Sequence, residues 1–358
     1  AARGGRRGAA GRALGWLAVL LALLLVPPVA ARPAAAQAGA PPALFGVAGH
    51  AWWLDPHFDQ FLALYRDLGV TGVRVAVDWK QFERQEGQYD FDIFDRVLSR
   101  LNAAGLEITA VFVTVPPWVA SDPAGCRASE QGRCDVPAAR EPQLRAAARA
   151  AVARYPFVRR WEVGNEPELW RYLGHDAADY LRVLRAFYGE AKAVDPDVQV
   201  AAATVTGWDY VHWLYEQADE RPWDVITFHP YGGGAGDADP APADVAADDP
   251  GTGLRTAEID RLRAGMVAMG DGAKPLWITE YGWMRDPATQ AARLRAALAW
   301  MASRPWITTA HLHMLHDAYG ETYGLTATVP PGGPSGPRTR FVPKQPFYDA
   351  FKYFPRAR

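Results

Sequence analysis

The chain has 358 residues, is 49% hydrophobic and contains 14 tryptophans, which is enough apolar material for one large core. Its formal charge is −2, and removal of residues 1–36 would take away five arginines and no acids, which changes it to −7. A mildly acidic chain without a basic stripe has no electrostatic reason to bind nucleic acid, so we expect no nucleic-acid partner.

The first 36 residues have the pattern of an export signal. Several arginines precede an apolar run over residues 13–26, and an alanine-rich segment follows. This order is typical of a secretory signal peptide, and the run is shorter than the roughly 20 apolar residues that span a bilayer. We predict a signal peptide over residues 1–36 and a secreted, monomeric protein without stable membrane insertion. An uncleaved anchor is the alternative.

Further along the chain, short apolar runs alternate with amphipathic stretches. The runs that predict strands are residues 44–49, 72–77, 107–114, 160–164, 198–204, 223–228, 275–280 and 308–314. The stretches that predict helices are residues 57–68, 91–104, 139–154, 176–194, 208–218, 254–269, 286–302 and 346–354. Eight strands that alternate with eight helices predict an α/β fold, a (β/α)₈ TIM barrel, as a single domain over residues 37–358.

Three segments between these elements are expected to be loops. Residues 232–256 and residues 328–343 are rich in glycine and proline and predict long loops without secondary structure. Cys126 and Cys134 are the two cysteines of the chain and lie in a third such segment. In an exported protein they predict one disulfide that holds this loop, because the segment offers too few ligands for zinc.

Two of the predicted strands end at a glutamate that turn-forming residues follow at once. Residues 161–167 read Trp-Glu-Val-Gly-Asn-Glu-Pro and contain Asn165 and Glu166, and Glu280 lies at the end of a similar run. Side chains at the carboxyl ends of barrel strands point into the active-site mouth, and glycoside hydrolysis requires two carboxyl groups there. We predict Glu166 as general acid/base, Glu280 as nucleophile and Asn165 as a contact to a sugar hydroxyl. A helix cap and a structural ion pair are the alternatives for the two glutamates.

Other polar residues fall at the same end of the predicted barrel. His229 and Tyr231 follow a strand, where they would orient a substrate or keep Glu280 ionised; a structural, hydrogen-bonded histidine is the alternative. Arg74 lies in an otherwise apolar strand and requires an anionic partner. We expect a catalytic glutamate to be that partner, with a purely structural ion pair as the alternative.

Aromatic residues crowd the predicted loops. They are Trp52, Trp53, Trp79, Trp118, Trp170, Trp208 and Trp283. Sugars stack their apolar faces on such rings, although buried tryptophans that only pack are also common. Trp118 and Trp283 are our candidates for substrate contact, and the spread of the whole set favours a long substrate.

A histidine-rich segment near the C-terminus raises the question of a metal. His311 and His313 would share one face of a strand, and His316 follows shortly after. We find no convincing third ligand at a suitable spacing, and the nearby acids already have a catalytic role. We therefore expect no metal and no cofactor, and we treat His313 as a substrate-pocket residue.

At these residues the chain resembles the retaining glycoside hydrolases of clan A, and it looks most like families 39 and 5. The resemblance covers residues 45–354 and rests on Asn165-Glu166-Pro167, Glu280, His229, Tyr231 and Arg74. It implies a double-displacement mechanism without metal, with Glu166 as acid/base and Glu280 as nucleophile. The chain departs from the pattern at the eighth strand, where many members carry an aromatic residue and this sequence offers His311 or His313.

The sequence as a whole predicts an exported retaining glycosidase that acts on an oligosaccharide or polysaccharide. Two alternatives share the same residues. One is a transglycosylase that remodels cell-surface polysaccharide, and the other is a glycan-binding barrel without catalysis.

Overall fold

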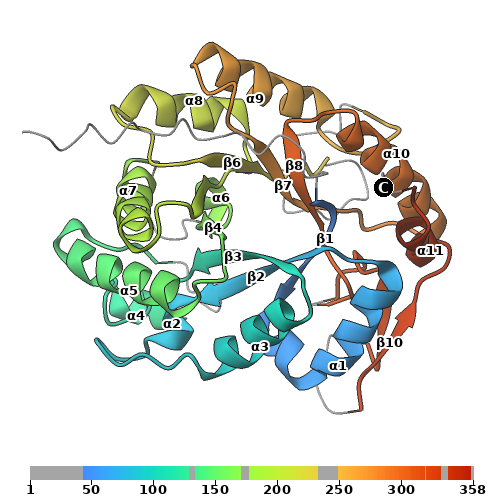
Figure 1. Ribbon diagram of the computed structural model, residues 1–358, viewed down its shortest axis with the longest axis horizontal. Helices are drawn as coiled ribbons and strands as arrows, with labels where there is room; N and C mark the ends of the chain where they lie inside the picture. The colour runs from blue at the N-terminus through green and yellow to red at the C-terminus, as the bar shows by residue number, and fades with distance from the viewer. Residues whose placement is uncertain are drawn as a thin grey trace, which may run out of the picture. The chain divides into compact units, whose positions relative to one another are not determined.

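Eight short apolar runs form a closed barrel of parallel strands in the computed structural model (Figure 1), which describes residues 43–128, 134–170, 177–232, 249–318, 320–331 and 338–355. The strands are β1 (Ala43–His50), β2 (Gly72–Asp78), β3 (Glu107–Val113), β4 (Arg160–Val163), β5 (Gln199–Ala202), β6 (Val225–Phe228), β7 (Leu276–Tyr281) and β8 (Ile307–Leu312). Each strand pairs in parallel with the next, and β1 also pairs with β8, which closes the sheet.

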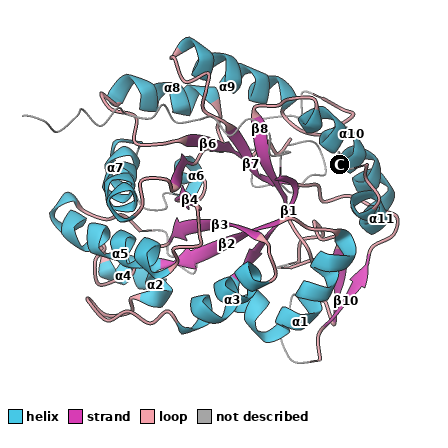
Figure 2. Ribbon diagram, viewed as in Figure 1, coloured by secondary structure: helices cyan, strands magenta, loops and turns pink. Residues whose placement is uncertain are grey.

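Helices follow the strands and surround the barrel (Figure 2). They are α1 (Ala51–Leu68), α2 (Trp79–Phe82), α3 (Asp92–Ala103), α4 (Pro123–Ala128), the 3₁₀ turn η1 (Ala138–Arg140), α5 (Glu141–Arg154), α6 (Pro167–Trp170), α7 (Ala177–Val194), α8 (Trp208–Gln217), α9 (Thr256–Ala268), α10 (Pro287–Ala302) and α11 (Phe347–Lys352). The predicted (β/α)₈ TIM barrel is confirmed. Among the described residues, no helix is both long and apolar enough to cross a membrane.

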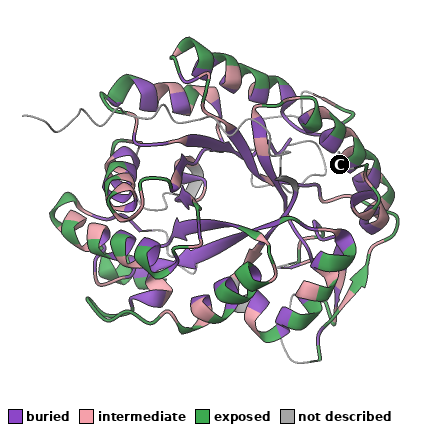
Figure 3. Ribbon diagram, viewed as in Figure 1, coloured by how far each residue is buried: buried purple, intermediate pink, exposed green. Residues whose placement is uncertain are grey.

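The strands are buried on both faces, while the helices turn their outer faces to solvent (Figure 3). All seven residues of β2 are buried. Its outward-facing Val73 and Val75 belong to the main core, and Ala76 packs with Val111 and Val113 on the other face. A parallel strand that is covered on both faces reads as a continuous apolar run. This burial is why strand positions could be predicted from the sequence.

The side chain of His311 lies in the barrel interior beside β1. In the register of β1 with β8, Gly46 lies opposite His311, and a Cβ atom at Gly46 would lie 2.3 Å from Cδ2 of that histidine. Any residue other than glycine would therefore displace the buried imidazole. His313, two residues further along the chain, directly follows β8 and lies at its carboxyl end.

Two predicted boundaries were wrong. Helix α1 begins at Ala51 instead of residue 57, because the chain is helical on both sides of a kink where His57 has φ −123° and ψ 17°. Pro56 lies inside this helix, and a proline normally indicates a boundary.

The predicted loop at residues 328–343 is flanked by β9 (Thr326–Val329) and β10 (Arg340–Pro343), which pair antiparallel. Most of the other predicted loop, residues 233–248, lies outside the described residues, as does the predicted signal peptide.

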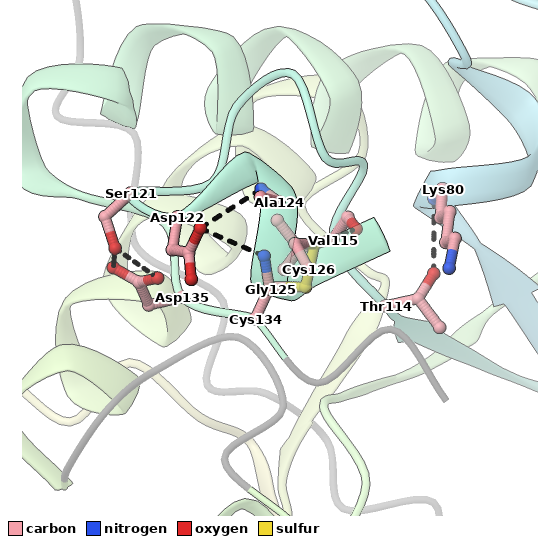
Figure 4. Close-up of a disulfide and its surroundings, with 10 residues drawn as sticks. All are labelled: Lys80, Thr114, Val115, Ser121, Asp122, Ala124, Gly125, Cys126, Cys134 and Asp135. Atoms are coloured by element: carbon pink, nitrogen blue, oxygen red, sulfur yellow. Dashed lines mark hydrogen bonds between the residues drawn. A yellow bond between two sulfur atoms is a disulfide. The ribbon is translucent and has the colours of Figure 1, made fainter. Parts of the chain in front are cut away.

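A disulfide closes the segment after β3, as predicted (Figure 4). Cys126 and Cys134 are joined, their Cα atoms lie 5.4 Å apart, and both side chains are buried. Asp122 accepts hydrogen bonds from two backbone N–H groups in the first turn of α4, and Ser121 donates to Asp135 at 2.6 Å. Hydrogen bonds and a covalent link thus hold both ends of this segment.

Candidate active site

The two predicted glutamates meet at the carboxyl end of the barrel. Glu166 follows β4 and Glu280 lies near the end of β7, and one carboxylate oxygen from each lies within 4.8 Å of the other. His229 and Tyr231 come from the end of β6 and lie beside them. The structure therefore brings together residues that are separated by more than a hundred positions in the sequence.

Arg74 connects three of the strands from inside the barrel. It donates from Nε to Glu162 at 2.7 Å and from NH1 to Glu280 at 2.6 Å. Its NH2 group donates to Oδ1 of Asn165 at 2.7 Å. The guanidinium is nearly buried, and each of its nitrogens has an oxygen partner, so the arginine fixes the positions of all three side chains. The expected glutamate partner, Glu280, is present, and Glu162 also provides the structural ion pair that was the alternative.

Glu280 is surrounded by groups that stabilise its negative charge. Burial alone would raise its pKa and is the largest single effect, but the charges of His229, Arg74 and His313 together outweigh it. A hydrogen bond from Tyr231 at 2.9 Å acts in the same direction. The pKa of Glu280 is therefore well below the usual value for a glutamate. Its side chain is 13% exposed, so this ionised group remains accessible.

The turn after β4 aims Glu166 at the same place. Gly164 and Glu166 have φ angles of 76° and 47°, in the left-handed region that non-glycine residues seldom adopt. Such backbone costs on the order of 1–3 kcal/mol and is often found at functional sites. Two residues further on, Glu168 accepts backbone hydrogen bonds from Val205 and Thr206 at 3.1 Å, which ties this turn to the loop after β5.

His229 lies between the two sides of the site. Its Nδ1 is 2.8 Å from Oε1 of Glu166, and its Nε2 is 3.1 Å from the hydroxyl of Thr279. The ring is 1% exposed. Burial acts most strongly and lowers the pKa of His229, but the charge of Glu280 and the hydrogen bond and charge of Glu166 together raise it above its usual value.

Below these residues, a fully buried carboxylate was missed by the sequence interpretation. Glu162 has 0% exposure and binds Arg74 through Oε2. Its Oε1 accepts hydrogen bonds from the hydroxyls of Thr227 at 2.7 Å and Thr279 at 3.0 Å. Glu162 lies in β4, four positions before Glu166, and was visible in the sequence, but its partners lie on β2, β6 and β7.

The strand ends on the β8 side add further polar groups. Nδ1 of His313 lies 3.7 Å from Glu280, and the ring contacts those of Tyr231 and Tyr323. His50, at the end of β1, has a pKa lowered to about 3 by burial and then by the charge of His313. The pKa of Glu321 is raised by burial and then by the charge of Glu280. The charges of the cluster thus act on His50 and Glu321, which the sequence did not single out.

The tryptophans that were predicted in the loops differ in how far their rings are exposed to a ligand. Trp283 is 2% exposed, packs against Tyr281 and donates from its indole to the carbonyl of Gly253, so it presents no open face to a ligand. Trp79 is fully buried. Trp118 is half-buried, and its indole N–H binds the carbonyl of Glu83 at 2.8 Å. Tyr281, the neighbour of Glu280 in the sequence, faces the core with 0% exposure, and the donors to Glu280 are Arg74 and Tyr231.

Glu166, His229 and Glu280 also offer three atoms within 4.8 Å of one another, a spacing that a metal ion could use. Each of them already has a partner in the protein. Glu280 is paired with Arg74, and both nitrogens of His229 are within hydrogen-bond distance of an oxygen. A cation here would compete with the fixed charge of Arg74. The hydrogen-bond network accounts for the cluster without a metal.

Comparisons with known proteins give two kinds of similarity. The glycoside hydrolase 42 family, described as beta-galactosidase, matches residues 51–195. The beta-galactosidase BbgII of Bifidobacterium bifidum is 31% identical over an alignment of 153 residues, and the match covers 38% of this chain and 22% of that protein. The chain thus spans about a fifth of this relative's length. The family match ends before β5, and the match to BbgII covers less than half of the chain.

Solved structures match over most of the chain. A glycoside hydrolase family 39 enzyme from Xanthomonas axonopodis pv. citri has a TM-score of 0.62 and 20% identity, with 89% of this chain and 67% of that chain covered. A monomeric beta-xylosidase from Caulobacter crescentus CB15 has a TM-score of 0.62 and 18% identity, with 88% and 69% covered. At these identities the similarity shows a shared barrel fold.

Proposed function

We propose that this chain, whose fold, motifs and similarities fit a clan A (β/α)₈ glycoside hydrolase, cleaves O-glycosidic bonds with retention of configuration. The observation that carries the proposal is the approach of a Glu166 oxygen and a Glu280 oxygen to within 4.8 Å. Retaining enzymes have carboxyl groups about 5–5.5 Å apart, whereas inverting enzymes need about 6.5–9.5 Å to admit a water molecule. The short separation favours a direct attack by one carboxylate.

Glu280 would be the nucleophile. In the first step its oxygen forms a bond to the anomeric carbon while the bond from that carbon to the glycosidic oxygen breaks. The leaving oxygen keeps the electron pair and takes a proton from Glu166. Arg74 and Tyr231 support this role because they favour the ionised form of Glu280 and hold its two oxygens in place.

Glu166 would then change from acid to base. A water molecule attacks the anomeric carbon, transfers a proton to Glu166 and releases Glu280 from the glycosyl ester. Glu166 has a side chain that is 4% exposed and a direct hydrogen bond to His229, so its proton is held away from bulk solvent. A shielded carboxyl group that can give and regain a proton is what both steps require.

The anomeric form of the first product tests this proposal. A panel of aryl β-glycosides should include a galactoside, because the family match and the curated relative are named for that activity, and a xyloside, because of the structural neighbour. Proton NMR of the fresh reaction should show the β-anomer first. Initial appearance of the α-anomer would indicate inversion and would refute the double displacement.

Substrate length and location are separate parts of the proposal. We propose an oligosaccharide or polysaccharide substrate on the basis of the tryptophans in the predicted loops, although Trp79 and Trp283 are buried and do not add to that support. We propose export on the basis of the pattern in residues 1–36. Mass spectrometry of the N-terminus of the protein recovered outside the cell would test export, and a retained residue 1–36 segment would contradict it.

A further inference from the structure

A chain of hydrogen bonds runs from Arg74 to the proposed acid/base, and it passes through two residues with no assigned role. Arg74 binds Glu162, the hydroxyl of Thr279 lies 3.0 Å from Glu162, and Thr279 in turn lies 3.1 Å from Nε2 of His229. Nδ1 of the same ring is 2.8 Å from Glu166. Glu162, Thr279 and His229 are all at most 1% exposed, so bulk water does not compete for these bonds.

The direction of each hydrogen bond follows from the number of protons available. The ion pair with Arg74 keeps Glu162 as a carboxylate, which can only accept hydrogen bonds. Thr279 has a single hydroxyl proton, and it points to Glu162. The oxygen of Thr279 must then accept from His229, so Nε2 of His229 carries a proton. Nδ1 is left to face Glu166.

We propose that Thr279 and Glu162 are positioning residues that keep a proton on Nε2 of His229, so that Nδ1 shares the catalytic proton with Glu166. The inference rests on the proposed function and deepens it. With Nε2 protonated, the pair has two arrangements: Glu166 donates its O–H to a neutral imidazole, or the imidazolium donates from Nδ1 to a carboxylate. In both, one proton lies between the two residues and is available to the leaving oxygen.

The same arrangement explains how Glu166 becomes a base in the second step. Once the proton has gone to the leaving oxygen, the lone pair of Nδ1 and the carboxylate of Glu166 face each other across 2.8 Å. The fixed proton on Nε2 prevents the ring from turning an N–H group toward Glu166 by a change of tautomer. Two facing acceptors are unfavourable, and a proton taken from the attacking water relieves this repulsion.

Charged groups from every neighbouring strand act on this pair. Glu162 and Glu166 come from β4 and its end, and Glu280 comes from β7 with its oxygen 3.8 Å from Nδ1 of His229. Arg74 of β2 and His313 after β8 oppose a positive charge on the ring. The pKa of His229 is nevertheless raised, because the charge of Glu280 and the hydrogen bond and charge of Glu166 outweigh burial, which is the direction expected for a ring that shares a proton with Glu166.

The chain offers a matched control for Thr279. Thr227 is equally buried and donates to the same oxygen of Glu162 at 2.7 Å, whereas the hydroxyl within hydrogen-bond distance of Nε2 of His229 is that of Thr279. Thr279→Val and Thr227→Val each remove one hydroxyl bond to Glu162 and should lower stability similarly. Only Thr279→Val removes the acceptor for His229. Thr279→Ser keeps the hydroxyl and should therefore keep the kcat and the pH profile of the wild type.

Kinetics of these variants separate a positioning role from a structural one. Thr279→Val should lower kcat on substrates with poor leaving groups on the order of 10- to 100-fold, a part of what general acid catalysis contributes, and should spare the first step with an activated aryl glycoside. The basic limb of kcat/KM should move to lower pH by on the order of one unit, about the effect of one hydrogen bond. Thr227→Val should show neither change.

A spectroscopic measurement decides the proton position without activity. In the full chain labelled with ¹⁵N-histidine, two-bond nitrogen–proton correlations report which ring nitrogen of neutral His229 carries the proton. We expect Nε2 in the wild type and in Thr227→Val, and a mixture in Thr279→Val. A neutral ring that carries its proton on Nδ1 and none on Nε2 in the wild type, or identical pH profiles for the two valine variants, would overturn the proposal. If that happened while Glu280→Gln remained inactive, the glycosidase assignment would still stand.

Discussion

Replacement of Arg74 by methionine should raise the pKa of Glu280 and make the enzyme more sensitive to acid. Methionine has similar bulk but no charge, so Glu280 would lose the 2.6 Å bond to NH1. A hydrogen bond to a charged group contributes about 1.5–3 kcal/mol, and one pKa unit corresponds to about 1.4 kcal/mol. We therefore expect the pKa of Glu280 to rise by about one to two units, still opposed by Tyr231 and His229.

The direction of the pH effect follows from the ionised form of Glu280, which Arg74 favours. The folded protein holds the pKa of Glu280 below its unfolded value, so this group contributes stability above the unfolded pKa and loses it as pH falls through the folded one. Without Arg74 the pH range between the folded and unfolded pKa values of Glu280 becomes narrower. The nucleophile is then protonated at a higher pH. The acid limb of kcat/KM should move upward by the same one to two units.

Stability should also fall, because Glu162 would be left as a buried charge without its partner. Breaking such a pair costs about 3–5 kcal/mol. At about 2–4 °C per kcal/mol for a domain of roughly this size, the melting temperature should drop on the order of 10 °C. The melting temperature of Arg74→Lys should be intermediate, because one ammonium cannot reach the three acceptors with the geometry of a guanidinium.

The assay is a pH profile of kcat/KM on an aryl glycoside, with thermal melts on the same samples. Arg160→Met is the control: Arg160 lies at the other end of the barrel, where it binds Glu107 at 2.8 Å and Thr309 at 3.1 Å. That variant should leave the acid limb in place. An unmoved acid limb in a folded Arg74→Met variant would refute our account of how Glu280 is kept ionised.

Three further predictions follow from the site and the disulfide. Glu280→Gln should abolish turnover without loss of folding, because an amide cannot form the glycosyl ester; near-normal rates on the true substrate would exclude it as nucleophile. Glu166→Ala should impair substrates with poor leaving groups most, and added azide should partly restore the rate on an activated substrate, whereas equal losses without rescue would contradict an acid/base role. Replacing Cys126 and Cys134 with serine should lower the free energy of unfolding by about 2.5 kcal/mol, measured with urea, and an unchanged midpoint would show that other contacts hold the loop.

The sequence was sufficient to predict the barrel and the two glutamates for the same physical reason. Strands that are buried on both faces read as apolar runs, and a carboxylate at the end of such a run stands out. The order of strands in a parallel barrel then places those ends together. Arg74 was found in the same way, as a charge inside an apolar strand.

The hydrogen-bond partners could not be predicted, because they depend on contacts across the barrel. Thr279 binds Glu162, which lies 117 positions away in the sequence. Adjacency in sequence does not identify the donor to Glu280: Tyr281 is its neighbour, but strand alternation turns that side chain outward into the core. Tyr231, which donates the bond, comes from another strand.

The buried bond between Arg74 and Glu162 has a consequence for how related sequences can diverge. Loss of either partner alone leaves an uncompensated charge in the interior, whereas simultaneous replacement by apolar residues of similar volume is often tolerated. Positions 74 and 162 should therefore covary among homologues. Because Arg74 also binds Glu280, lineages that replace both residues would keep a stable barrel with a nucleophile that is less firmly held and protonated at a higher pH, so this pair offers a short evolutionary route from an enzyme to a sugar-binding protein.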